Sequence, residues 1–305
     1  MHLTRSSTHT VWDRAIAPVA RVDPGDEVTV ELANSSGGQL AKDSTDKDVA
    51  ALDFAKVNPV TGPIAIDGAE AGDVLVVDVI DIHVDPWGWT ANIPGFGLLA
   101  DDFPFAHLRA SSISGGQVEL LPGLVLPSVP MIGTIGVAPP QAKPSSVLVP
   151  TRFGGNMDVR HVSAGARLLL PVGIAGGLLS LGDTHAAQGD GEICGTGIET
   201  GSTVTLRLSL IRHREIRFPL IETDSRTTRS GNAVAATGIG PDLMGATRDA
   251  ARGLIDEIVR RTGLDPLDAY LLASVAADLK ISEVVDAPNW VVSMHIERDV
   301  LEGTR

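Results

Sequence analysis

The chain has 305 residues, a single cysteine and a formal net charge of −14 at pH 7. Such an acidic chain does not suit a nucleic-acid binder, which needs a basic surface, or a protein attracted to anionic lipid. One cysteine also excludes an internal disulfide framework and a zinc site built from several cysteines.

The amino-terminal segment and the apolar stretches indicate where the protein resides. Residues 1–10 lack the apolar core of a signal peptide. The uncharged apolar run at residues 168–182 is too short to span a membrane and is interrupted by one proline and four glycines. Together with the single cysteine, these features predict a soluble cytoplasmic protein with no membrane partner and no nucleic-acid partner.

Short β-branched segments bounded by turn residues occupy much of the chain. Residues 28–32 and 74–80 each follow a Gly-Asp turn, and apolar and polar side chains alternate along residues 203–211. Other strands are expected at 117–121, 167–171 and 290–296. Many short strands separated by turns favour a sandwich or barrel over a doubly wound sheet.

Helical spacing is strong only near the end of the chain. Residues 241–261 carry apolar side chains at this spacing, with Asp242 at the start and Gly263 as a stop. Asp265 and Pro266 predict the beginning of a second helix that runs to about Leu279. We therefore expect a mainly β fold with this helical pair packed at its edge.

The segment at residues 182–192 concentrates polar chemistry after a wholly apolar run. It contains Asp183, His185, Gln188, Asp190 and Glu192 between glycines. On an extended strand Asp183 and His185 point to one face, and Asp190 and Glu192 repeat that spacing. Carboxylates and an imidazole on one face suit a divalent metal or a general acid/base site. The alternative is an acidic surface hairpin, because Asp-Gly loops are common turns.

Three smaller features are candidates for the same site. Asn156 and Asp158 follow the paired glycines Gly154 and Gly155 in a polar cluster, although an ordinary Asn/Asp turn explains it equally well. Glu70 lies in a turn segment and most simply belongs to the surface. Cys194 is either a nucleophile next to a carboxylate base or a small buried apolar side chain.

Common catalytic motifs are absent from the sequence. There is no Gly-x-Ser-x-Gly, Walker loop, Rossmann glycine fingerprint or His-Glu-x-x-His. Serine-hydrolase, nucleotide-binding and zincin hypotheses therefore lack their usual support.

Six segments, in collinear order over nearly the whole chain, resemble the acetamidase/formamidase family. They are residues 57–64, 68–75, 94–97, 154–158, 182–192 and 268–279. The resemblance implies a jelly-roll-type β-sandwich with a smaller β part and an α+β part. It also implies hydrolysis of the C–N bond of small linear amides to a carboxylate and ammonia. Because the chain ends soon after residues 290–296, it resembles the shorter, acetamidase-like branch.

The residues and the resemblance together define a set of expectations. We predict an amidase acting on a small amide substrate, with three parts at residues 1–140, 141–235 and 236–305, and a homodimer or higher homo-oligomer. The metal is predicted to be zinc, with calcium and magnesium left open. The metal ligands are predicted to be Asp183, His185 and Asp158; the catalytic residues Glu192, Asp190 and Glu70; and the substrate-binding residues Asn156, Gly155 and Gln188.

Two rival hypotheses stay open on the sequence. One is a metal-free amidase that uses Cys194 as nucleophile and Glu192 as base. The other is a non-enzymatic β-sandwich protein that binds calcium or a small molecule.

Overall fold

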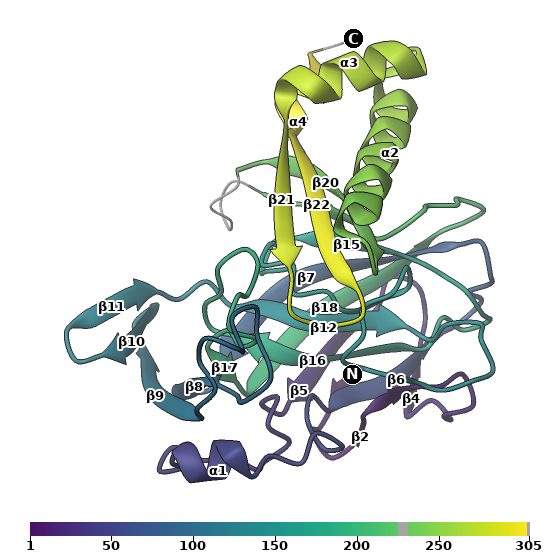
Figure 1. Ribbon diagram of the computed structural model, residues 1–305. Helices are drawn as coiled ribbons and strands as arrows, with labels where there is room; N and C mark the ends of the chain where they lie inside the picture. Colours follow the sequence, from purple (N-terminus) through teal and green to yellow (C-terminus); the bar gives the residue numbers. More distant parts are fainter. Residues whose placement is uncertain (225–230, 304–305) are drawn as a thin grey trace.

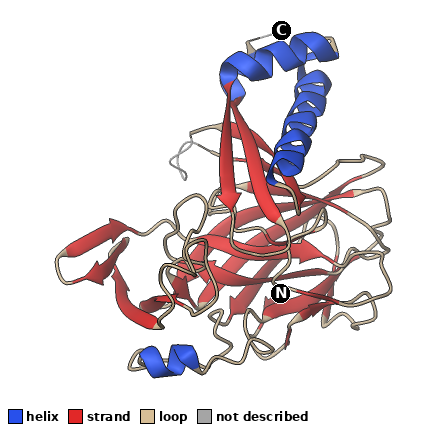
Figure 2. Cartoon of the chain, viewed as in Figure 1, coloured by secondary structure: helices blue, strands red, loops and turns tan. Residues whose placement is uncertain are grey.

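The computed structural model describes residues 1–224 and 231–303. Strands hold 41% of the chain and helices 14%, so the prediction of a mainly β fold is confirmed (Figure 2). Over the described residues the strands form two large sheets and a small two-stranded one (Figure 1). The small sheet pairs β3 (Val11–Trp12) with β13 (Ser145–Ser146).

The first large sheet contains most of the strands that the sequence predicts. Its members, in spatial order, are β1 (His2–Leu3), β5 (Glu27–Leu32), β18 (Ser202–Ile211), β7 (Val74–Val84), β15 (Arg167–Pro171), β19 (Leu220–Glu222), β20 (Ala233–Gly240), β22 (Trp290–Glu297) and β21 (Ala277–Glu283). The alternation expected for residues 203–211 is present, since Val204, Leu206 and Leu208 are buried and Arg207 is exposed.

The second large sheet contains the polar segments. Its main path is β11 (Leu124–Pro127), β10 (Gln117–Leu121), β9 (His107–Ser114), β8 (Trp87–Asn92), β17 (Glu199–Thr200), β16 (Leu179–His185), β12 (Met131–Val137) and β14 (Gly154–Asn156). β6 (Val60–Ile66) pairs with β16 and also with β2 (Thr8–His9) and β4 (Ala20–Val22). β9, β10 and β11 extend from the body as an arm (Figure 1).

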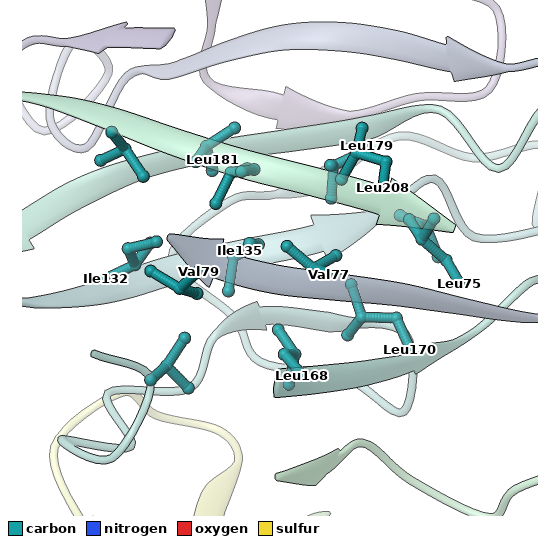
Figure 3. Close-up of a cluster of buried hydrophobic side chains, with 14 of the residues drawn as sticks. Leu75, Val77, Val79, Ile132, Ile135, Leu168, Leu170, Leu179, Leu181 and Leu208 are labelled. Atoms are coloured by element: carbon teal, nitrogen blue, oxygen red, sulfur yellow. The ribbon is translucent and has the colours of Figure 1, made fainter. Parts of the chain in front are cut away.

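The two large sheets face each other across the main core. Leu75 and Leu208 of the first sheet and Ile132 and Leu181 of the second belong to one cluster of buried apolar side chains (Figure 3). Their burial removes apolar surface from water, which is the main driving force for joining the sheets. Both sheets draw strands from before and after residue 140, and the three-part division of the chain stays a prediction.

The helical pair packs where the sequence places it. α2 (Leu243–Thr262) begins after Asp242, whose side chain accepts a hydrogen bond from the Gly245 N–H at 2.6 Å, and ends at Gly263 in the left-handed conformation. α3 (Pro266–Ala276) follows the Asp265 cap. α2 lies against β20 and β22, and the two helices extend with β21 and β22 beyond the other strands (Figure 1).

The predicted end of the second helix was wrong. The helix stops at Ala276, and residues from Ala277 onward form β21 instead. The reason is tertiary, because Leu279 and Ile281 pair in register with Met294 and Val292 of β22. Two short helices, α1 (Asp46–Ala50) and α4 (Arg298–Glu302), complete the fold. No helix in the described ranges combines the length and apolarity needed to cross a membrane.

Candidate active site

The candidate site lies where β12, β14, β16 and β17 run next to one another. His185 is the last residue of β16, and Glu199 of β17 is its direct partner in register. Asp183 lies two residues before His185, and Asp158 lies two residues after β14. The structure therefore brings together the three predicted metal ligands from different segments of the chain.

Six buried carboxylates surround His185. Among the described residues, His185 is the only histidine in the groups that could hold a metal ion. Each carboxylate residue is at most 8% exposed; they are Asp158, Asp183, Glu192, Glu199, Glu283 and Asp286. Two sets have ligand atoms within 4.8 Å of one another, namely Asp158, Asp183, His185 and His185, Glu192, Glu199. Buried negative charge at this density is costly unless cations or protons compensate it.

The hydrogen bonds of His185 define the roles of its two ring nitrogens. Gln188 donates through Nε2 to the backbone oxygen of Asp158 at 2.7 Å, which turns its Oε1 toward His185 Nδ1 at 2.7 Å. Nδ1 therefore carries a proton. Nε2 faces two acceptors, Glu199 Oε1 at 3.1 Å and Asp183 Oδ1 at 3.3 Å. Burial lowers the pKa of His185, but the charges of Glu199 and Asp183 outweigh it and raise the pKa well above its ordinary value. A cation held by the same carboxylates would take the place of the Nε2 proton.

Asp158 supplies the clearest sign of a missing positive partner. It is 1% exposed, and neither of its carboxylate oxygens has a hydrogen-bond partner among the described residues. Burial raises its pKa well above the ordinary value, and the charges of Asp183 and Asp286 raise it further. A buried carboxylate without donors is expensive unless it binds a cation.

The other acidic groups divide by their surroundings. Burial raises the pKa of Glu192 and of Asp286 well above the ordinary range, with neighbouring carboxylates adding to the effect. Burial also raises the pKa of Glu283 to about 7. Burial acts in the same direction on Asp183, but the charge and hydrogen bond of His185 outweigh it, so its pKa is lowered. Closely spaced groups with divergent proton affinities are typical of functional sites.

Left-handed backbone is concentrated at this site. Of the six non-glycine residues with positive φ in the described ranges, Asn58, Asp158, Asp183 and Glu192 contribute to it, with φ between 44° and 57°. Such conformations cost on the order of 1–3 kcal/mol each and persist where the surrounding structure enforces them. Asp183 is therefore not extended as expected, although its side chain still meets His185.

Amide side chains connect the acidic groups. Asn58 donates through Nδ2 to Asn156 Oδ1 at 2.8 Å and approaches Asp183 Oδ2 at 3.3 Å. Asn156 in turn donates to Asp286 Oδ2 and accepts a bond from Thr134. Asn156, expected to bind substrate, thus serves in this structure to hold carboxylates in place.

Two cavities meet at Glu192. The inner one has a volume of about 40 Å³. Its lining includes the apolar side chains of Trp89, Ile93 and Phe96 and four of the six carboxylates, namely Asp183, Glu192, Glu199 and Asp286. The outer one has a volume of about 460 Å³ and reaches Arg160 and the apolar side chains of the arm. Glu192 lines both cavities. The Glu192 carboxyl group is therefore part of the wall of both cavities.

Four residues singled out in the sequence lie apart from the inner cluster. Glu70 is exposed in the turn before β7. The Asp190 side chain is 35% exposed, with its Oδ1 atom 4.0 Å from His161 Nε2. Cys194 lines the outer cavity, and its thiol lies 3.5 Å from the backbone oxygen of Thr196. Gly155 is buried in β14 opposite Ile135 and lines neither cavity.

Sequence reasoning missed Glu199, Asp286, Glu283 and Asn58. Glu199 reaches the site through strand register, and Asp286 through the β21–β22 connection, although it is 130 positions from its partner Asn156. No spacing pattern in the sequence links these residues. The one local signal was that Asn58 and Asp286 lie in proline-containing turns, Asn58-Pro59 and Asp286-Ala287-Pro288.

Gly133 of β12 provides a test of the carboxylate arrangement. A Cβ atom at this residue would overlap Asp158 Oδ1 and would lie 2.6 Å from Asp183 Oδ2. We expect Gly133→Ala to displace both carboxylates and lower activity about 100-fold, since a shift of about 1 Å at a catalytic site has such an effect. Steady-state kinetics on small amides and circular dichroism would measure the effect.

Gly240 is the matched control. It ends β20, has no atom within 4 Å of the Cβ position and needs no positive φ. Gly240→Ala should leave activity unchanged. Equal activity of Gly133→Ala and wild type would show that the positions of these carboxylates do not matter for the reaction.

Comparison with known proteins gives consistent results. The model of the Acetamidase/Formamidase family matches residues 1–149 and 141–303. A formamidase of Methylophilus methylotrophus is 29% identical over 96% of this chain and 89% of its own length. The crystal structure of an acetamidase from Bacillus halodurans superposes with a TM-score of 0.92 at 32% identity, covering 100% of this chain and 99% of that one. A structure from Thermoanaerobacter tengcongensis, described as a predicted acetamidase/formamidase, has a TM-score of 0.90 at 31% identity and covers 100% and 99% of the two chains.

Proposed function

The chain belongs to the acetamidase/formamidase family, and on this basis we propose that it hydrolyses the C–N bond of short linear amides to a carboxylate and ammonia. The reaction needs an activated water, stabilisation of the tetrahedral oxyanion and a proton for the departing nitrogen. The buried cluster around His185, with Asp158 lacking any hydrogen-bond donor, is the observation that carries the proposal.

A divalent cation fits this set of residues. Carboxylate oxygens and one imidazole nitrogen lie within 4.8 Å of one another. Both carboxylate oxygens of Asp158 are buried without a hydrogen-bond donor, which favours a bound positive ion beside them. Asp158, Asp183 and His185 would hold the ion, with Glu199 as a further ligand. We propose zinc, because calcium and magnesium prefer sites made of oxygen alone. Such an ion, when bound, would lower the pKa of water and polarise the amide carbonyl.

Glu192 is the proposed general base. It lies between the two cavities, and its Oε1 is 3.8 Å from His185 Nδ1. Because burial raises its pKa, its carboxylate has a stronger affinity for the proton of the attacking water than an exposed glutamate has. The same carboxyl group would then deliver this proton to the leaving nitrogen.

The inner cavity favours a very small acyl group. Its volume is about 40 Å³, and a cavity of about 10–15 Å³ already holds one water, so the space suits a compound of a few non-hydrogen atoms. Formamide and acetamide are of this size. The apolar wall formed by Trp89, Ile93 and Phe96 would contact the methyl group of acetamide, and the acidic wall would contact its amide group.

Metal analysis tests the proposal directly. We expect purified protein to contain about one divalent ion per chain, and chelation to reduce ammonia release at least about 100-fold, with recovery on adding zinc. Elemental mass spectrometry and an ammonia assay on formamide and acetamide would measure both. Full activity in protein shown to be metal-free would contradict the metal-dependent mechanism. Absence of ammonia release from metal-loaded, folded protein over a panel of small amides would contradict the function.

Two broader expectations complete the proposal. A cytoplasmic location is supported by the acidic composition and the single cysteine. A homodimer or higher homo-oligomer is the proposed assembly. The rival of a purely calcium-binding β-sandwich loses support because the chain belongs to a family whose curated relatives are named as amidases.

A further inference from the structure

Helix α3 buries small side chains and exposes large apolar ones, the reverse of the usual arrangement. Its buried residues are alanines, Ala269 and Ala273, which pack into the core beside α2. Its outward face carries Leu267, Tyr270, Leu271 and Val275, which are 64%, 57%, 57% and 85% exposed. A surface helix ordinarily places its large apolar residues inside. A helix with apolar side chains on all sides is ordinarily buried on all sides.

The sequence of α3 contains almost nothing that would favour exposure to water. Asp268 is the only charged residue between Pro266 and Ala276, and it lies in the first turn, where a carboxylate favours the helix dipole. The apolar exposure continues into the strand that follows, since Leu279 is 53% and Ile281 is 43% exposed. β21 is also the last strand of its sheet, with β22 as its only paired strand in the described part of the chain.

The size of this surface fits an interface between proteins. The six side chains together expose on the order of 600 Å², an area at the upper end of the range for the largest apolar patch of a monomeric protein. Each partner in a standard interface buries about 800 Å², so this surface would supply most of that area. α3 also lies at the outer end of the region formed by α2, β21 and β22, where another molecule can reach it (Figure 1).

The pattern on α3 favours a second copy of this chain as the occupant. Leu267, Leu271 and Val275 are spaced by four residues and form one ridge along the helix. The commonest helix packing interdigitates ridges of this spacing from both helices, and a two-fold axis supplies the same ridge twice. The net charge of −14 makes two copies repel, so a self-contact is best placed on a surface with few acidic groups, and Asp268 is the only acidic residue of α3.

We propose that the face defined by Leu267, Tyr270, Leu271 and Val275, extended by Leu279 and Ile281, is the two-fold interface of a homodimer. The inference deepens the proposal of a homo-oligomer and does not depend on the reaction that the site performs. In the dimer the α3 helices of both copies pack against each other, and their large apolar side chains form one continuous core with the alanine-lined interior.

Sedimentation equilibrium of the full-length protein tests the interface. Wild type should sediment as a dimer at about micromolar concentration, and Leu271→Glu with Val275→Glu should raise the dissociation constant at least about 100-fold. Because these side chains are exposed, the double variant should retain the wild-type circular dichroism spectrum. Leu271→Ala, a milder change, should weaken the dimer in the same direction, and this variant decides the question if the charged pair impairs folding.

The β10–β11 hairpin offers a matched control. Leu124 and Val125 are 46% and 47% exposed, so Leu124→Glu with Val125→Glu introduces the same charge on another apolar patch. This variant should remain a dimer. A wild-type protein that is monomeric throughout the concentration range would overturn the inference. So would an oligomer that both α3 variants leave intact, or one that the hairpin variant dissociates while the α3 variants do not.

Discussion

Glu192→Gln should lower kcat for acetamide and formamide by about a thousandfold, within the range that general base catalysis contributes. Glutamine keeps the shape of the side chain but takes no proton from water. Glu192 is buried at the junction of the two cavities, so no bulk water replaces its carboxylate. Stopped-time ammonia assays on the metal-loaded variant would give kcat and KM, and elemental analysis would show whether metal is retained.

Cys194→Ala is the matched comparison for the thiol mechanism. Cys194 lines the outer cavity and contacts Thr196, whereas Asp183, His185 and Glu199 line the inner one. We therefore expect this variant to keep activity within about threefold of wild type, as for a side chain that contributes only packing. Loss of activity in Cys194→Ala together with full activity in Glu192→Gln would assign the reaction to the thiol and overturn the proposed role of Glu192.

Local sequence patterns predicted the elements of this fold better than their ends. β-branched runs between turns correspond to β5, β7 and β18, and the Asp242 and Gly263 signals match the two ends of α2. These features succeed because each depends on neighbouring residues. The end of α3 was missed because pairing with β22 decides it, and β22 begins 14 residues after Ala276.

At the site, too, the sequence predicted residues that are close together in the chain and missed those that are far apart. Asp183 and His185 were found because they lie two residues apart after an apolar strand, and they meet at 3.3 Å. The reasoning from an extended strand was nevertheless incomplete, since Asp183 has φ of 57°. Glu199 and Asp286 are determined by strand register and by the β21–β22 connection, and the sequence contains no spacing that reports either.

Asp158→Asn should make the metal-free protein more stable while it lowers the activity of metal-supplied protein at least about 100-fold. Asp158 is buried without a hydrogen-bond donor and faces Asp183 and Asp286. Its ionised form therefore destabilises the fold when no cation is present, and a neutral amide removes that charge. His185 Nδ1 lies 3.8 Å from Asp158 Oδ1, beyond hydrogen-bond distance, and a buried charged group without a hydrogen bond costs about 3 kcal/mol. Urea unfolding in the presence of a chelator would measure the difference.

The pH dependence follows from the direction of the pKa shift. Because the folded-state pKa of Asp158 is raised above its unfolded value, the stability linked to its protonation is complete below the unfolded value and is lost as pH rises through the folded value. Chelated wild type should thus lose stability as pH rises above the ordinary range of an aspartate, about pH 4, and the advantage of Asp158→Asn should be larger at pH 8 than at pH 5. Asp190→Asn, at a half-exposed carboxylate, should show no such advantage. If Asp158→Asn were less stable than wild type at pH 8 in chelator, the carboxylate would have a stabilising partner of its own, and the main structural reason to place a cation beside it would be removed.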